Sequence, residues 1–145
     1  MFNGGSSLAI VSSGEAASTA IMNTIISPAA AGVTTFVIKN KVSGQNLDVR
    51  YDFSGLTNGI LAGLVAITAS CDSVESWAAI VIGILGAFVY CLTVRAANAL
   101  KIDDPLEAFH VHGACGILGV VCVAFFQKDK GILYGNSDGW DQLKT

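Results

Sequence analysis

Long apolar stretches alternate with short clusters of charge along this chain of 145 residues. Four segments contain no Asp, Glu, Lys or Arg, and each is 19 to 23 residues long: residues 16–38, 53–71, 76–94 and 108–127. A helix needs about 20 mostly apolar residues to cross a bilayer. The pattern therefore predicts an all-α integral membrane protein with four transmembrane helices, near 16–38, 53–71, 76–99 and 105–126.

Composition favours the same class. Hydrophobic residues make up 52% of the chain and charged residues 13%, whereas about 25% charged residues is usual in a soluble domain. The alternative, a soluble all-α bundle, is disfavoured because its helices would carry a polar stripe. The sequence has no basic patch of the kind that binds nucleic acid. The apolar segments make a lipid bilayer the expected partner. The residues after Met1 lack the features of a cleavable signal peptide, and we expect the four cysteines to be small buried hydrophobes.

The charged connections indicate an orientation in the membrane. Five bases lie in the loops after the first and third spans: Lys39, Lys41, Arg50, Arg95 and Lys101. The intervening loop, residues 72–75, has acids and no base. The positive-inside rule therefore places the two basic loops in the cytoplasm. Residues 1–15 and the tail from Lys128 then lie outside, although the lysines of that tail oppose this orientation.

The last span begins with the signals of a helix start. Asp103 and Asp104 precede Pro105, and Glu107 follows within the first turn. Asp as N-cap, proline at the first helical position and an acid in the first turn are all favourable. The sequence therefore predicts a helix that starts at Pro105.

Two histidines stand inside this otherwise uncharged span. His110 and His112 are costly at membrane depth, where ionisable side chains mark pathways by default. Successive helical residues are about 100° apart, so the two imidazoles point about 200° apart and cannot hold one ion. Cys115 shares the face of His112, but no further His or Cys completes a metal site. We therefore expect no metal, no cofactor and, since no acid follows Glu107 in the span, no enzyme.

We expect His112 to line a pore and His110 to be a packing or peripheral residue. A neutral imidazole offers one N–H donor and one lone pair, which suits a small neutral molecule that both gives and accepts hydrogen bonds. A core histidine bonded across helices is the alternative for His112. Asn23, in the first span, is expected to bond to a neighbouring helix or to backbone, with a direct pathway role as its alternative.

In combination, several runs of the chain resemble the ammonium transporters of the Amt/Mep/Rh superfamily, in particular its plant- and protist-like Amt branch. These runs are residues 2–6, 23–24 with 29–32, 59–68, 77–80, 103–107 leading to 111–113 and 115–116, and 128–135. The resemblance implies a fold of eleven helices, with two inverted repeats of five and a final helix, in a trimer with one pore per subunit. By this resemblance residues 1–145 cover the end of the sixth helix through the tenth. Inverted repeats build their site between the two halves, so this segment would carry half of a pore.

Three positions match motifs that carry function in that family. Phe2 is similar to a phenylalanine that gates the outer pore mouth, Ser6 to a serine that helps to hold ammonium in the external vestibule, and His112 to one of two pore histidines. His110 departs from the pattern, because relatives usually have Gly or Gln there. The implied function is transport of ammonium or ammonia by a homotrimer, through a hydrophobic, histidine-lined pore in the plasma membrane.

Two other classes stay open from the residues alone. One is a small glycine-rich membrane protein that serves as an interaction partner or scaffold and has no pore. The other is a membrane protein that binds a metal through His112 and Cys115. Complementation of cells deficient in ammonium uptake would separate the first from a transporter, and additional ligands within the spans would favour the second.

Overall fold

The computed structural model describes residues 2–6, 14–42, 52–135 and 138–143, and these contain helices and no strand. A short helix α1 (Phe2–Gly5) precedes the long α2 (Gly14–Val42), followed by α3 (Phe53–Thr68) and α4 (Ser76–Leu100). A π-helical segment η1 (Phe109–Ala114) leads into α5 (Cys115–Phe126), and then come η2 (Ile132–Tyr134) and α6 (Asp138–Gln142).

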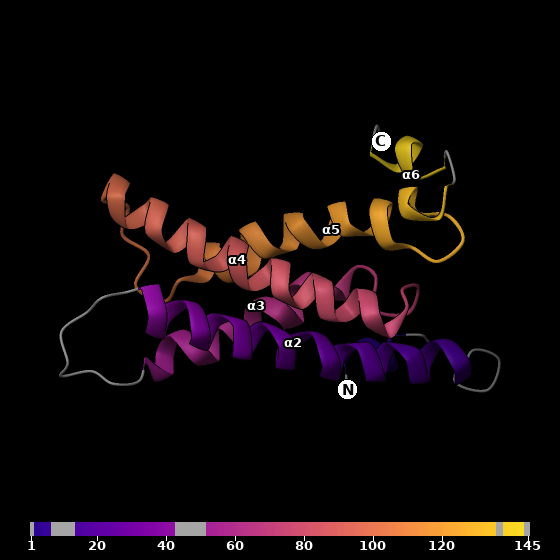
Figure 1. Cartoon of the computed structure of the whole chain (residues 1–145), viewed down its shortest axis with the longest axis horizontal. Coiled ribbons are helices and arrows are strands. Elements are labelled where there is room, and N and C mark those ends of the chain that lie inside the picture. Colours follow the sequence, from indigo (N-terminus) through magenta and orange to yellow (C-terminus); the bar gives the residue numbers. More distant parts are fainter. Residues whose placement is uncertain (1, 7–13, 43–51, 136–137, 144–145) are drawn as a thin grey trace.

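The long helices run up and down in an elongated bundle (Figure 1). α2 packs against both α3 and α4, and α5 packs against α3 and α4 on the far side from α2. Because successive helices reverse direction, the end of α2, the start of α3, the end of α4 and the start of η1 gather at one end of the bundle. We call this the basic-loop end, because it carries Lys39 and Lys101.

Within the described residues, three helices are long and apolar enough to cross a membrane: Gly14–Asn40, Ser76–Leu100 and Phe109–Phe126. α3 is apolar but has only 16 residues, about 24 Å at 1.5 Å per residue, so it ends before the residue 71 that the sequence predicts. Its last turn closes with a bond from Ser70 N to Ile67 O of 3.1 Å. The protein is therefore an all-α integral membrane protein, and the limits of the four spans remain predictions.

Small residues let the helices approach closely, as is usual in membranes. Gly63 of α3 lies against Pro28 and Ala31 of α2, and Gly83 of α4 lies against the backbone of Ser27. The Ser27 hydroxyl also donates a hydrogen bond of 3.0 Å to the carbonyl oxygen of Gly63. These contacts join α2, α3 and α4 near the middle of α2.

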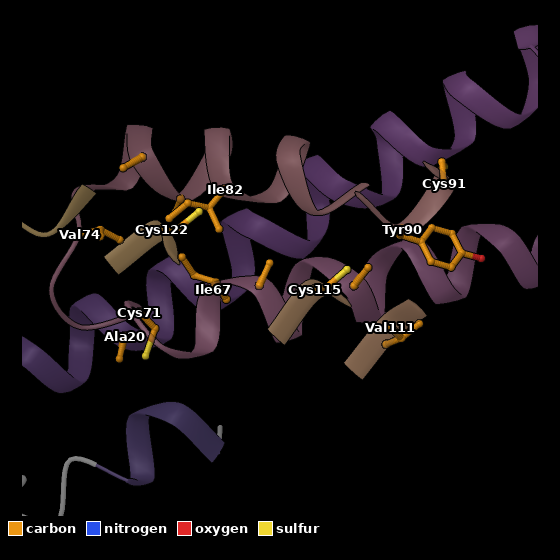
Figure 2. Close-up of a cluster of buried hydrophobic side chains, with 14 residues drawn as sticks. Ala20, Ile67, Cys71, Val74, Ile82, Tyr90, Cys91, Val111, Cys115 and Cys122 are labelled. Carbon is orange, nitrogen blue, oxygen red and sulfur yellow. The ribbon is translucent and has the colours of Figure 1, made fainter. Parts of the chain in front are cut away.

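All four cysteines are buried and free, as expected from their apolar surroundings. Figure 2 shows them within a cluster of buried side chains that includes Ile67, Ile82 and Tyr90. The cysteines therefore serve as small core residues in this fold.

The start of the last long helix differs from the sequence-based prediction. Residues 104–107 form a turn closed by a bond from Glu107 N to Asp104 O of 3.0 Å, with Pro105 at its second position. Proline suits that position of a β-turn as well as it suits a first helical position. Glu107 has a left-handed backbone with φ of 54°, which interrupts a right-handed helix. The prediction of a helix from Pro105 is therefore wrong, and the π-helix begins at Phe109.

Candidate functional site

The two histidines lie on different sides of η1. His110 is buried, with 4% of its surface exposed, whereas His112 is exposed. This separation agrees with the spacing argument, although the segment is a π-helix and not an α-helix. π-helical turns are rare and frequently occur at functional sites.

His112 is one of several exposed residues of η1 and α5, which together we call the His112 face. It consists of His112 with Phe109, Ile117 and Val120, whose exposed fractions are 61%, 67% and 66%. Large apolar side chains at such exposure on a single chain mark a surface for lipid or protein. The only polar side chain of the His112 face is the imidazole of His112, which can donate one hydrogen bond and accept another.

His110 instead faces the turn that precedes η1. Its Nε2 lies 3.8 Å from Oδ2 of Asp104, and its ring meets the edge of Phe109 with 5.7 Å between centroids. The Nδ1 atom is buried and has no hydrogen-bond partner among the residues that the structure describes. Asp104 also accepts hydrogen bonds from Ala108 N at 3.1 Å and Phe109 N at 2.9 Å. His110 is thus packed beside the helix start, on the side opposite to the His112 face.

The structure does not bring His112 and Cys115 together as metal ligands. Cys115 is fully buried, and its thiol contacts the carbonyl oxygens of His110 at 3.3 Å and Gly86 at 3.6 Å. His112 is exposed whereas Cys115 is buried in the bundle, so the two side chains do not lie on the same side of the segment. No group of three or more His, Cys, Asp or Glu able to hold a metal occurs among the described residues. The expectation that Cys115 shares the face of His112 is therefore wrong.

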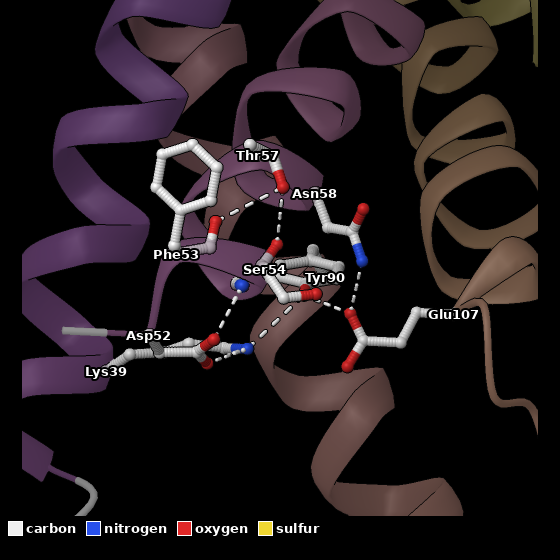
Figure 3. A network of polar contacts seen from close by, with 9 residues as sticks. Lys39, Asp52, Phe53, Ser54, Thr57, Asn58, Tyr90 and Glu107 are labelled. Carbon is white, nitrogen blue, oxygen red and sulfur yellow. Dashed lines mark hydrogen bonds and ion pairs between the residues drawn. The ribbon is translucent and has the colours of Figure 1, made fainter. Parts of the chain in front are cut away.

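A polar network at the basic-loop end connects the start of η1 to three other segments (Figure 3). Oε2 of Glu107 accepts hydrogen bonds from Asn58 Nδ2 at 2.7 Å and from the Tyr90 hydroxyl. Lys39 Nζ lies 3.3 Å from the Tyr90 hydroxyl and 2.9 Å from Oδ2 of Asp52. We call these five residues the Glu107 network. Sequence reasoning missed Asn58 and Tyr90; the available signal was a polar side chain inside each of two apolar segments.

Asp52 gives this network its electrostatic character. Its Oδ1 caps α3 by accepting a hydrogen bond of 2.8 Å from Gly55 N. Partial burial raises the pKa of the Asp52 carboxyl. The hydrogen bonds from Gly55 and Lys39 and the charge of Lys39 lower this pKa, and together they outweigh the effect of burial. The net effect is a pKa below the ordinary value, so Asp52 carries a full negative charge at neutral pH.

At the other end of the bundle, Glu75 forms a smaller cluster of hydrogen bonds. One of its carboxylate oxygens accepts bonds from Trp77 Nε1 at 2.6 Å and from the Tyr134 hydroxyl at 3.1 Å. These two hydrogen bonds lower the pKa of the Glu75 carboxyl below its ordinary value. The pKa of the Tyr134 hydroxyl is raised, first by desolvation and then by its hydrogen bond to Glu75 and the charge of Glu75. The cluster links the start of α4 to η2 without touching η1.

The remaining predicted site residues lie on or near α1 and α2. Ser6 is exposed at the end of α1, and the side chain of Phe2 lies outside the described part of the structure. Asn3 donates a hydrogen bond of 3.0 Å to the Thr24 hydroxyl, which holds α1 on α2. Asn23 is fully buried and bonds to the backbone carbonyls of Cys71 and Val74, in agreement with the expected bond to a neighbouring segment.

Comparison with known proteins gives a consistent result. The family model described as "Ammonium Transporter Family" matches residues 1–144. The chain is similar to ammonium transporter 1 member 1 of Arabidopsis thaliana, with 38% identity over 120 residues, covering 81% of this chain and 23% of the relative. It is similar to ammonium transporter 1 member 3 of Solanum lycopersicum, with 36% identity over 126 residues, covering 86% and 27%.

A solved structure shows the same arrangement of helices. The crystal structure of Saccharomyces cerevisiae Mep2 superposes with a TM-score of 0.79 and 30% identity, over 89% of this chain and 31% of that chain. This chain therefore spans about a quarter to a third of the length of the proteins it matches.

Proposed function

The chain belongs to the Ammonium Transporter Family, and from that premise we propose that it forms part of a membrane pore that carries ammonium or ammonia. The match of the family model to residues 1–144 carries this proposal. The membrane-spanning helices and the similarity to the yeast Mep2 structure support it. A transport role needs no catalytic group, so the proposal assigns the chain no enzymatic activity and no cofactor.

We propose that the His112 face is the half of the pore wall contributed by this segment. The residues of this face are exposed, its other side chains are apolar, and its single polar group is the imidazole of His112. Passage of a bare cation past apolar side chains costs several kcal/mol, about 3 kcal/mol on insertion scales for a charge in a helix. Release of a proton from ammonium to the external water at the outer mouth lowers that barrier, and the imidazole of His112 then bonds to the neutral ammonia.

Phe2 and Ser6 are proposed to act before that step, at the outer mouth. An aromatic face and a hydroxyl together attract a small cation, because the ring quadrupole and the oxygen lone pairs are both negative. Asn23 and His110 receive no contact with the transported molecule in this proposal, since both are buried in packing contacts. We further propose that the complete protein is a homotrimer in the plasma membrane.

The test uses what we call the complete transporter. This is the protein in which the segment is joined to the rest of a family pore, from its own gene or by grafting residues 1–145 into the equivalent part of yeast Mep2. It is expressed in cells without their own ammonium transporters, and uptake of isotope-labelled ammonium is measured at micromolar concentration.

We expect uptake well above that of cells with an empty vector, and competition by unlabelled ammonium. Parental Mep2 provides the positive control for the graft. A complete transporter that reaches the membrane at the abundance of Mep2 and moves no ammonium would refute the proposed function. That outcome would favour the pore-free scaffold class.

A further inference from the structure

Glu107 occupies an unusual place in the fold. It is the residue at which the turn of residues 104–107 ends, two residues before η1 begins. Its φ of 54° places a non-glycine residue in the left-handed region. Such a conformation persists where surrounding contacts hold it, and it is frequent at functional sites.

The contacts that hold Glu107 come from two helices. Its Oε2 accepts one hydrogen bond from Asn58 on α3, at 2.7 Å, and another from the Tyr90 hydroxyl on α4. Figure 3 shows both donors converging on this one oxygen. Tyr90 is itself fully buried and contacts Lys39 of α2 through a hydrogen bond of 3.3 Å and through its ring, 5.3 Å from Nζ. The carboxylate is thus fixed to the rigid part of the bundle.

The backbone of Glu107 continues directly into the histidine segment. Its carbonyl oxygen accepts a hydrogen bond of 3.1 Å from Val111 N, the residue between the two histidines. A change in the orientation of this carbonyl would therefore change which positions of η1 face the bundle. The alternative to the observed register is a regular α-helix, in which the faces presented by residues 110 and 112 would rotate.

We infer that Glu107 is a positioning residue for the pore histidine. Held by Asn58 and Tyr90, its carboxylate fixes the register of η1, and this register turns His112 outward and His110 inward. The inference rests on the proposed function for its transport consequences, but the register itself can be measured without transport. Because both donors to Glu107 are neutral groups, its role requires a hydrogen-bond acceptor and not a negative charge.

Three substitutions separate these requirements in the complete transporter. Glu107→Ala removes the acceptor, and Glu107→Gln keeps an acceptor oxygen of the same reach without the charge. The double change Tyr90→Phe with Asn58→Leu removes both donors and leaves Glu107 in place. Glu75→Ala is the matched control, because Glu75 also accepts two side-chain hydrogen bonds but lies at the opposite end of α4.

The first readout is the register of η1. A cysteine is placed at position 110 or 112, and its rate of reaction with a small cationic methanethiosulfonate is measured in detergent, with the four buried native cysteines as background. We expect residue 112 to react at least tenfold faster than residue 110 when the Glu107 contacts are intact. Glu107→Ala and the double change should each reduce this ratio at least threefold, while Glu107→Gln and Glu75→Ala should leave it unchanged.

The second readout is transport. Glu107→Ala should lower the maximal uptake rate about tenfold with KM within twofold, because recruitment at the outer mouth is untouched. Glu107→Gln should stay within threefold of the unmodified protein. If Glu107→Ala does not reach the membrane, the double change must show the same losses.

An unchanged 112-to-110 ratio in Glu107→Ala or in the double change would overturn the inference. It would also be overturned if Glu107→Gln were as impaired in transport as Glu107→Ala, since that result would assign the carboxylate a charge- or proton-holding role. If the unmodified protein moved no ammonium while the ratio behaved as expected, the proposed function would fail and the positioning role would stand.

Discussion

The side-chain amide of Asn23 lies 2.8 Å from the backbone carbonyl oxygen of Val74, 51 positions away in the sequence. The same Nδ2 donates to the carbonyl oxygen of Cys71 at 2.9 Å. Both carbonyls belong to the connection between α3 and α4, in which Cys71 and Val74 are buried. A buried carbonyl without a partner is costly, so Asn23 satisfies a connection that no regular helix can satisfy.

Substitution of Asn23 by Ala is expected to destabilise the fold. Two buried acceptors would lose their donor, and a buried polar group left without a hydrogen bond costs about 1–3 kcal/mol. We expect a total near 2 kcal/mol, seen as a lower thermal midpoint of the detergent-solubilised complete transporter. Ser18→Ala is the control, because Ser18 donates a hydrogen bond to Glu15 O at an exposed site and its loss should change stability by less than about 0.5 kcal/mol. Equal midpoints for the two variants would contradict this role of Asn23.

Gly83→Ala is expected to disturb the crossing of α2 and α4. An added Cβ would clash with the backbone carbonyl of Ser27, which cannot move without shifting α2. Overpacking of this kind costs about 1–3 kcal/mol. Gly14→Ala adds the same methyl group where the described residues packed around it leave open space, and alanine is the better helix former. Thermal midpoints should therefore fall for Gly83→Ala and stay or rise for Gly14→Ala; the reverse order would show that the crossing is not tight.

The cap formed by Asp52 predicts a specific dependence of stability on pH. Since its pKa in the folded state lies below the ordinary value of 3.8, the stability from its ionised form is fully present above about pH 4 and is lost as pH falls through the folded pKa. Asp52→Asn keeps a good capping residue without this titration. The midpoint of the unmodified protein should thus exceed that of Asp52→Asn at neutral pH, and the difference should shrink below pH 4.

Asp52→Ala supplies the second arm of this experiment. It removes the cap at every pH and should cost about 1 kcal/mol. A difference between the unmodified protein and Asp52→Asn that grows as the pH falls would contradict the depressed pKa.

Much of the fold could be predicted because the length of each apolar segment, read along the sequence, indicates where a helix crosses the membrane. Backbone groups in lipid must be satisfied within the segment, so charge-free segments of sufficient length indicate helices, and α2 and α4 lie where those segments lie. The missed feature is the start of the last helix. Pro105 is compatible with both a first helical position and a β-turn, and the choice depends on donors from Asn58 and Tyr90 that are distant in sequence.

The candidate site likewise has some features that the sequence predicts and others that depend on contacts between distant residues. The opposite faces of His110 and His112 follow from spacing alone, because the angle between positions two apart is large in any helix. The π-helix itself and the separation of Cys115 from His112 could not be read from local sequence. They follow from how the turn at 104–107 is anchored to α3 and α4.

The most direct test of the account compares His112→Ala with His110→Gly in the complete transporter, with labelled ammonium uptake measured at matched membrane abundance. His112→Ala removes the only polar group of the His112 face and should reduce uptake about tenfold or alter the preference between ammonium and methylammonium. His110→Gly removes a buried packing residue on the other side of η1 and should retain most of the uptake. Abolished uptake in His110→Gly together with unchanged uptake and selectivity in His112→Ala would contradict the assignment of the pore wall to the His112 face.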